Sequence, residues 1–418
     1  MNVLLKSAVI VDPTSKHHLK KRDVLLENGK ISKIAASISN TKKAKEIDLK
    51  NLHISQGWFD PSVSFGEPGF EERETISNGL KTAAYSGFTQ VAVNANTFPV
   101  TDSKSNIKFL RSKAEGNAVS LYPIGALTMG SKGIDLAELY DMTNEGAISF
   151  YDYKRPIENA NLLKIALQYS QNFDGLVQSF PFDKSVARNG MVNEEVNSTK
   201  LGLKGIPALA EELQITRDLY LLEYTGGKLH IPTISTKKSV SLIKEAKKKG
   251  LNVSCSVAIT NLFLTDDVLE SFDTNYKLLP PLRTSEDNKA LLKGLKEGVI
   301  DGVTSDHDPI DIEHKKTEFD HACFGSIGLE SCFGALNSLV GIELAVEALT
   351  RLKGTFKIPM TPIAEGEVAN ITLFDPTKAW SFTKDDIRST SKNAALLHAK
   401  LKGKAHGVYA NNELILST

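Results

Sequence analysis

The middle of the chain repeats one pattern, in which a short apolar segment typical of a buried strand precedes a longer segment with helical periodicity. Helical segments end at Gly87, Gly226 and Gly250, as glycine-capped helices do. Eight strands are expected, in GWFDPSVSF (57–65), FTQVAVNA (88–95), SLYPIGAL (120–127), AISFYD (147–152), GLVQSF (175–180), KLHIPTIS (228–235), LNVSCSVA (251–258) and DGVTSDHDP (301–309). This repeat predicts an α/β fold, a (β/α)8 barrel, rather than an open doubly wound sheet.

The pattern of apolar residues at both ends of the chain differs from that of the middle. Short β patterns without intervening helices occur in VLLKSAVIV (3–11) and DVLLENGKISKI (23–34), and again in ANITLFDP (369–376) and GVYANNELIL (407–416). Asn28-Gly29 and Asn411-Asn412 are turn signals between strands. We therefore expect the two termini to meet in one small β domain.

Composition excludes several classes of function. The 418 residues include 50 Lys and Arg against 50 Asp and Glu, so there is no bulk field to attract nucleic acid or a membrane surface. No apolar run approaches the roughly 20 residues of a membrane span. Three dispersed cysteines do not make a disulfide framework, and the N-terminus resembles a strand rather than a signal peptide. A cytoplasmic location is expected.

Two serines raise a question about the first strand of the middle region. Ser62 and Ser64 occupy alternate positions near its carboxyl end, so both side chains face the same side. Barrels and open α/β sheets keep their chemistry at this end of the strands. The motifs place no histidine near either serine to act as a base, and no Gly-x-Ser-x-Gly elbow is present, so a nucleophilic serine is not indicated.

Long motifs resemble the dihydroorotases, which are cyclic amidohydrolases of the amidohydrolase superfamily. They are GWFDPSVSFGEPG (57–69), MVNEEVNSTKLGLKGIPALAEE (191–212), LEYTGGKLHIPTISTKKSV (222–240), LLPPLRTSEDNKALLKGLKEGVIDGVTSDHDPI (278–310), FGSIGLES (324–331) and EGEVANITLFDP (365–376). The resemblance implies a zinc-dependent barrel spanning 56–364, with a composite β-sandwich domain from residues 1–55 and 365–418. It also implies interconversion of carbamoyl aspartate and dihydroorotate in pyrimidine biosynthesis.

The resemblance also shows where this chain departs from the family. Metal-ligand histidines of the family correspond to Ser62, Ser64 and Thr233, and the carboxylate-binding arginine corresponds to Gly66. A neutral hydroxyl is a far poorer zinc ligand than an imidazole. The resemblance thus implies no metal at these positions, and no cofactor is expected.

Some family positions are retained. Asp306 corresponds to the metal-binding aspartate that shuttles the proton, and it would be the catalytic remnant of any activity. Asp152, with a register uncertain by one residue, is a second possible metal-ligand remnant. Asn96 and Arg283 correspond to substrate-binding positions, although a structural role fits Arg283 equally well.

Two hypotheses follow. The first is a metal-free, inactive homologue, a pseudoenzyme acting as an assembly partner, because metal-less relatives hold aspartate transcarbamoylase as structural subunits. The second is an active dihydroorotase or related cyclic amidohydrolase with a displaced metal site built from Asp152, Asp306, His307 and His230. A homo-oligomer is expected in either case.

Overall fold

A closed barrel of eight parallel strands forms the centre of the computed structural model, which describes residues 1–41 and 43–417. Neighbouring strands follow one another in chain order, and the barrel closes where the first strand meets the last. There His307 forms a parallel bridge with Val63 and accepts a 2.7 Å hydrogen bond from the amide of Ser64. The strands are β6 (Trp58–Val63), β7 (Phe88–Val93), β8 (Ser120–Gly125), β9 (Ser149–Phe150), β10 (Val177–Gln178), β13 (Leu229–Ile231), β14 (Val253–Ala258) and β15 (Gly302–Thr304).

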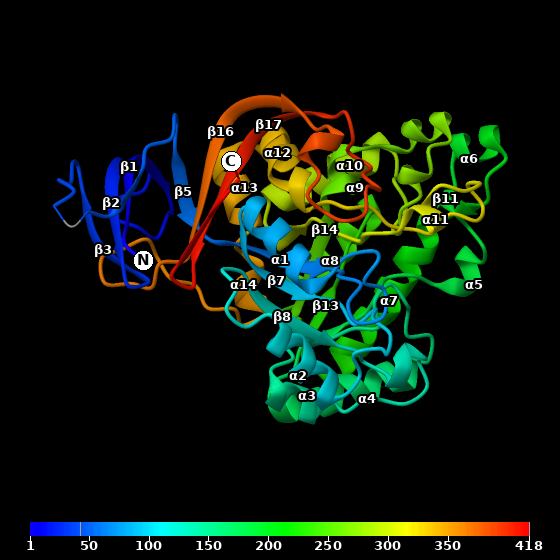
Figure 1. The fold of residues 1–418 in the computed structure, drawn as a ribbon. Coiled ribbons are helices and arrows are strands. Elements are labelled where there is room, and N and C mark those ends of the chain that lie inside the picture. Colours follow the sequence, from blue (N-terminus) through cyan, green and yellow to red (C-terminus); the bar gives the residue numbers. More distant parts are fainter. Residues whose placement is uncertain (42, 418) are drawn as a thin grey trace.

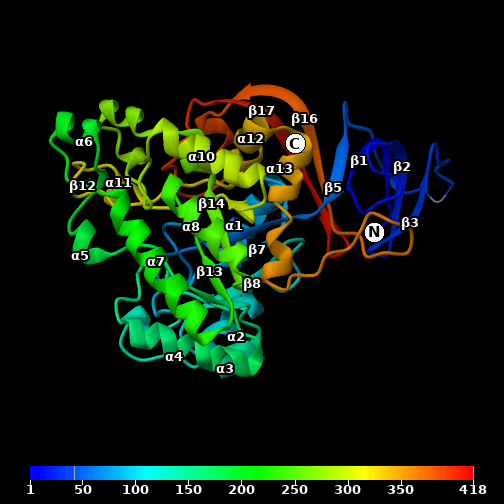
Figure 2. The same cartoon turned by 180° about the vertical axis from the view of Figure 1, so that it is seen from behind.

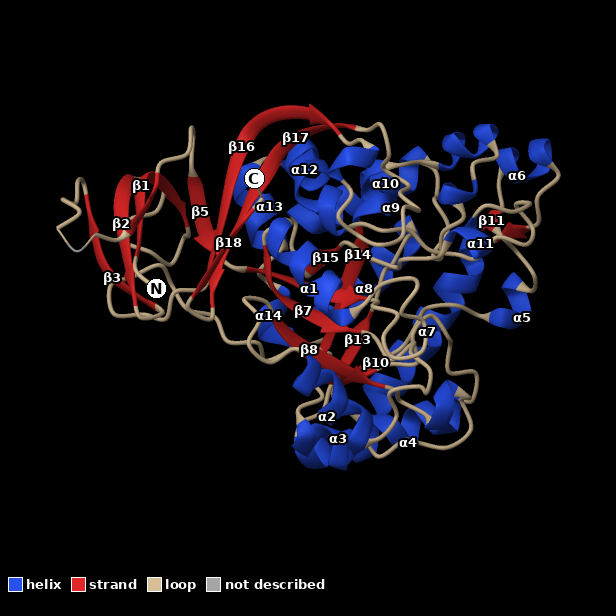
Figure 3. Ribbon diagram, in the orientation of Figure 1, coloured by secondary structure: helices blue, strands red, loops and turns tan. Residues whose placement is uncertain are grey.

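Helices surround the strands as an outer layer (Figure 3). Local sequence sets their ends: the Thr236 hydroxyl accepts from the amide of Ser239 at the start of α8, and Thr284 and Asp287 form a capping box on α10. The longer helices are α1 (Ile76–Tyr85), α2 (Lys104–Lys113), α3 (Leu139–Glu145), α4 (Ala160–Ser170), α7 (Ala208–Thr225), α8 (Lys237–Lys248), α10 (Ser285–Lys296), α12 (Leu329–Val340) and α13 (Ile342–Ala348). None of the described helices has the length and apolar character needed to cross a lipid bilayer.

Shorter elements lie in the loops between barrel strands and helices. The pair β11 (Val192–Asn193) and β12 (Gly205–Ile206) forms a small parallel flap. The short helices are α5 (Lys184–Ala187), α6 (Val196–Leu201), α9 (Ile259–Phe263), α11 (Ile312–Lys315) and α14 (Leu352–Thr355).

The second sheet contains strands from both ends of the chain (Figures 1 and 2). Strand β5 connects the N-terminal and C-terminal strands of this sheet, because it pairs in parallel with β1 and antiparallel with β16. The two expected turns are confirmed, because Asn28, Asn411 and Asn412 adopt the positive φ that tight hairpins require. The strands are β1 (Val3–Val11), β2 (Lys21–Glu27), β3 (Lys30–Ala35), β4 (Lys45–Ile47), β5 (His53–Gln56), β16 (Ile371–Ser381), β17 (Lys400–Ala410) and β18 (Glu413–Leu416).

An aromatic cluster joins the barrel to the second sheet. Trp58, at the start of β6, packs with ring centroids 6.0 Å from Phe88, 4.5 Å from Phe333 and 5.4 Å from Phe374. Its indole nitrogen donates to the hydroxyl of Ser55, which satisfies the one polar atom of a fully buried side chain. The predicted fold class, a barrel with a composite β domain, is therefore confirmed. The exact boundaries at residues 55/56 and 364/365 stay predictions.

Candidate functional site

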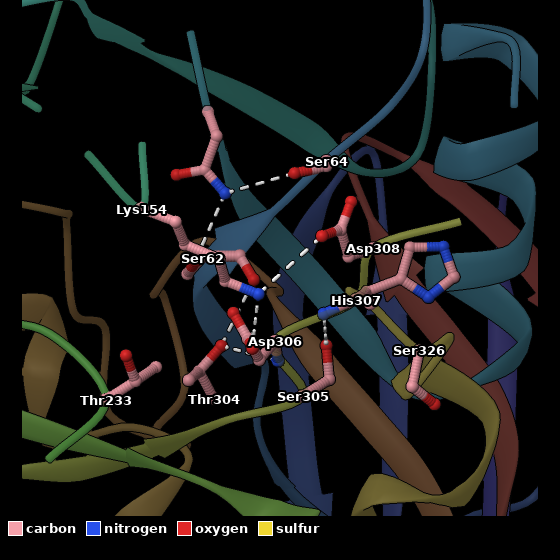
Figure 4. Close-up of polar contacts among 12 residues, drawn as sticks. Ser62, Ser64, Lys154, Thr233, Thr304, Ser305, Asp306, His307, Asp308 and Ser326 are labelled. Carbon is pink, nitrogen blue, oxygen red and sulfur yellow. Dashed lines mark hydrogen bonds and ion pairs between the residues drawn. The ribbon is translucent and has the colours of Figure 1, made fainter. Parts of the chain in front are cut away.

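The carboxyl ends of the barrel strands bring most of the candidate residues together. Figure 4 shows labelled side chains at or just after the ends of β6, β9, β13 and β15 converging on one space, which we call the barrel mouth. The residues of the barrel mouth are Ser62, Ser64, Lys154, Thr233, Asp306 and Asp308, together with Asn94, which is hydrogen-bonded to both serines. Chain order separates them by up to 246 residues (308 minus 62), so only closure of the barrel makes them neighbours.

The two serines share one partner. The Asn94 side-chain nitrogen donates to the Ser62 hydroxyl at 3.1 Å and to the Ser64 hydroxyl at 3.4 Å. All three side chains are buried, with Asn94 fully inaccessible. Because a side-chain amide is not a proton acceptor of useful basicity, this arrangement does not activate either hydroxyl as a nucleophile.

Asp306 is held by a lysine. The Lys154 ammonium nitrogen lies 2.9 Å from Oδ2 of Asp306 and 3.6 Å from Oδ2 of Asp308. The three side chains are only 10–12% exposed, so water screens this cluster weakly. The ammonium also lies 5.0 Å from the centre of the Tyr153 ring. The Lys154 ammonium is therefore the shared ion-pair partner of two carboxylates in the barrel mouth.

The pKa values in this cluster reflect burial and charge together. Burial raises the pKa of Asp306 to about 6, although Lys154 acts in the opposite direction. Burial by itself would lower the pKa of Lys154, but attraction to Asp306 and Asp308 outweighs it, so the lysine pKa is raised. At neutral pH the pair is accordingly an ammonium facing a carboxylate.

Three residues of the barrel mouth have left-handed backbone. Thr233, Lys154 and Asp306 follow β13, β9 and β15, and their φ angles are 49°, 53° and 48°. A positive φ is uncommon for a non-glycine residue and is disfavoured most for a β-branched one such as Thr233. Backbone strain of this kind gathers at functional sites and persists where surrounding contacts over-determine it.

Asp152 stands only two residues before Lys154 in the sequence, but its side chain points to the loop that follows β8. Its carboxylate accepts hydrogen bonds from the amides of Leu127 and Thr128 at 2.8 and 2.9 Å, and from the Thr128 hydroxyl. It is 1% exposed. These contacts fix the loop after β8 and leave the carboxylate without a contact to Asp306.

The two candidate substrate-binding residues differ in how they are engaged. The guanidinium of Arg283 is 2% exposed and donates to the Ser235 hydroxyl, the Asn193 side-chain oxygen and the carbonyl of Ile206. Arg283 thus ties the flap to the end of β13. Asn96 is partly buried, and its side-chain oxygen has no hydrogen-bond partner among the described residues.

The two histidines of the displaced-site hypothesis do not reach Asp306. His230 lies inside the barrel against Ser254 and Ser256, where burial lowers its pKa to about 3. His307 is fully buried, and its Nδ1 accepts from the amide of Gly328. Within residues 1–41 and 43–417, no three His, Cys, Asp or Glu side chains are grouped so that they could share a metal ion. The residues of the barrel mouth therefore do not suit a zinc ion.

Sequence reasoning missed three residues of the barrel mouth: Asn94, Lys154 and Asp308. Lys154 ends the segment FYDYK, two residues after Asp152, and Asn94 stands two residues before Asn96. A lysine at the carboxyl end of a buried barrel strand is a usable signal, because burial of an ammonium requires a partner. Its partner, 152 residues away, has no sequence signal.

Comparison with known proteins shows which family the chain resembles in sequence. A family profile described as "Dihydro-orotase-like" matches residues 53–239. A dihydroorotase of Pelotomaculum thermopropionicum is 40% identical over 414 residues, which cover 96% of each chain. A dihydroorotase of Geobacter metallireducens is 36% identical, with 97% of each chain covered.

Solved structures agree on the fold. An L-hydantoinase (dihydropyrimidinase) from Arthrobacter aurescens superposes with a TM-score of 0.86 at 20% identity, over 99% of this chain and 96% of that one. A dihydropyrimidinase from Brevibacillus agri gives a TM-score of 0.83 at 21% identity, over 100% and 95% of the two chains. At 20–21% identity, the similarity to these solved structures shows only the fold. The dihydroorotases that are 36–40% identical over nearly the whole chain show the family. This chain belongs to the dihydroorotase family.

Proposed function

We propose that this protein is a metal-free dihydroorotase-like protein of pyrimidine biosynthesis that is catalytically inactive and serves as a structural subunit. The observation that carries the proposal is the contact between Lys154 and Asp306 at 2.9 Å. An oxygen atom that holds an ammonium at this distance is not free to hold a metal ion.

The chemistry of ring opening explains why this contact matters. Hydrolysis of a cyclic amide in this family depends on a metal to lower the pKa of bound water from about 15.7 toward 7 and to polarise the carbonyl. In this chain, Ser62, Ser64 and Thr233 stand at positions that correspond to family ligands. The two serine hydroxyls are hydrogen-bonded to Asn94, and none of the three side chains is a good zinc ligand. Water in the barrel mouth therefore keeps its ordinary pKa and stays a poor nucleophile.

Resemblance to the family supplies the candidate partner. Metal-less homologues are known to hold aspartate transcarbamoylase, so that enzyme is the partner to test. The purified chain and the transcarbamoylase of the same organism are mixed and run on a sizing column, with carbamoyl aspartate formation measured before and after mixing. We expect co-elution and a gain in transcarbamoylase activity. Two separate peaks with unchanged activity would contradict this partner.

The alternative is an active dihydroorotase or related cyclic amidohydrolase. It is favoured by 40% identity to a protein named dihydroorotase over 96% of the chain. Elemental analysis and a dihydroorotate hydrolysis assay on the same preparation decide between the two, with Asp306→Asn as the matched control. We expect no stoichiometric zinc and no turnover above that of Asp306→Asn. Bound zinc with turnover that disappears in Asp306→Asn would establish the alternative.

A further inference from the structure

The loop after β9 places a positive charge where two negative charges meet. Lys154 reaches across the barrel mouth to Asp306 and Asp308, both of which follow β15 (Figure 4). The φ angle of Lys154 is 53°, which is a left-handed backbone conformation that lysine seldom adopts.

An ammonium in this position competes directly with a divalent cation. It occupies Oδ2 of Asp306, and its charge would repel a second cation a few ångströms away in a poorly screened space. The ammonium is tethered to the chain and present at all times, whereas a metal ion must be captured from solution.

Three side-chain oxygen atoms of the barrel mouth are without a hydrogen-bond partner among the described residues. They are Oδ1 of Asp306, Oδ1 of Asn94 and Oγ1 of Thr233, and all three are buried. Carboxylate, amide and hydroxyl oxygens together suit hard cations such as Mg²⁺, Mn²⁺ and Ca²⁺, whereas zinc sites are built from His, Cys and carboxylate ligands. The barrel mouth thus combines unpartnered oxygen atoms with a buried ammonium that contacts two carboxylates.

We propose that Lys154 is a tethered counter-ion, which neutralises Asp306 and Asp308 in place of a metal ion and keeps divalent cations out of the barrel mouth. Without its ammonium, the two carboxylates and the neighbouring oxygens become a site for a hard divalent cation. This inference rests on the proposed metal-free function and gives its mechanism.

The test compares four forms of the full chain: wild type, Lys154→Met, Lys154→Arg and Lys154→Met/Asp306→Asn. Methionine keeps the length of the side chain and removes the charge, and arginine keeps the charge. Each form is titrated with MnCl2, with free Mn²⁺ followed by electron paramagnetic resonance. Thermal unfolding is recorded in parallel with and without Mn²⁺ at constant ionic strength.

Lys154→Met should bind about one Mn²⁺ per chain, at least about tenfold more tightly than the wild type. Without metal its Tm should fall by about 3–6 °C, because two buried carboxylates lose their partner, and Mn²⁺ should restore much of this loss. The wild type and Lys154→Arg should bind Mn²⁺ in the barrel mouth at least about tenfold more weakly, and Mn²⁺ should leave their Tm unchanged. The double variant should lose the Mn²⁺ site, which assigns the metal to Asp306. If Lys154→Met folds poorly, refolding in the presence and absence of Mn²⁺ gives the same readout.

The two proposals fail in different ways. Equal Mn²⁺ binding by wild type and Lys154→Met, with no dihydroorotate turnover in either, would overturn the counter-ion inference alone. An unchanged Tm in Lys154→Met, with no response to Mn²⁺, would overturn it as well. A wild-type chain that holds zinc and hydrolyses dihydroorotate would instead contradict the proposed function.

Discussion

The amide of Ser305 donates a 3.0 Å hydrogen bond to Oδ2 of Asp60, across the seam where β15 meets β6. The other carboxylate oxygen accepts from the Thr304 hydroxyl at 2.6 Å and from the amide of Ser62 at 3.2 Å. Asp60 is fully buried, so these contacts form without competition from water. A single carboxylate therefore fastens the two ends of the barrel and positions Ser62.

The first prediction concerns this seam. Asp60→Ala leaves two amides and a hydroxyl buried without their acceptor, so we expect the free energy of unfolding to fall by about 3 kcal/mol or more. Asp60→Asn, which keeps the shape and one acceptor, should lose less. Asp135→Asn, at an exposed loop position, is the control and should be near neutral. Chemical denaturation measures all three, and equal stability of wild type and Asp60→Ala would disprove the role of Asp60 in closure.

A second prediction concerns the arginine that holds the flap. Arg283→Met removes a buried cation that joins Ser235, Asn193 and the carbonyl of Ile206. We expect a loss of about 3–5 kcal/mol and faster proteolysis within residues 183–207. Arg283→Lys should rescue this only partly, because an ammonium lacks the guanidinium fork. Limited proteolysis with mass spectrometry locates the cuts, and an unchanged pattern would indicate that the flap is held by other contacts.

The third prediction uses a lysine buried beneath the barrel. Lys353 is 2% exposed, and its ammonium makes no hydrogen bond or ion pair with the described residues. Burial lowers the pKa of Lys353 from 10.5 to about 7. Lys353→Met removes this buried ammonium and keeps the volume of the side chain. The variant should therefore be more stable than wild type by about 1–3 kcal/mol at pH 6.

The sign of the pH dependence follows from proton binding. Between pH 7 and 10.5 the folded wild type binds fewer protons at Lys353 than the unfolded chain, so its stability rises with pH. The advantage of Lys353→Met should thus be full below pH 7 and shrink toward pH 10.5. Denaturation at several pH values checks this, with Lys353→Ala as a control that opens a cavity. A constant difference across the range would show that Lys353 does not titrate in this way.

The fourth prediction concerns acid stability. Burial lowers the pKa of His230 from 6.5 to about 3, so the folded state disfavours the imidazolium. The contribution of a neutral His230 is present above pH 6.5 and is lost as the pH falls toward 3. In this window wild type should lose stability relative to His230→Gln by about 1.4 kcal/mol per pH unit. Parallel curves for the two proteins would contradict a buried, neutral His230.

Several elements were predictable because their signals are local. The eight barrel strands appear in the sequence as short apolar segments, and each one forms at its expected place. Asn28-Gly29 and Asn411-Asn412 predicted hairpin turns, since few residues tolerate the positive φ that such turns need. Strand periodicity likewise placed Ser62 and Ser64 on one face at the carboxyl end of β6.

The sequence by itself determined the architecture and the end of the barrel at which Ser62, Thr233 and Asp306 gather, because hydrophobic periodicity and turn chemistry act over a few residues. Only the tertiary structure decided the partners of these residues. Lys154 meets Asp306 across 152 positions, and Arg283 meets Asn193 across 90. Such contacts depend on closure of the barrel, on loop backbone and on side-chain rotamers. No local pattern encodes them, because charged groups find their partners only after the chain has brought distant strands together.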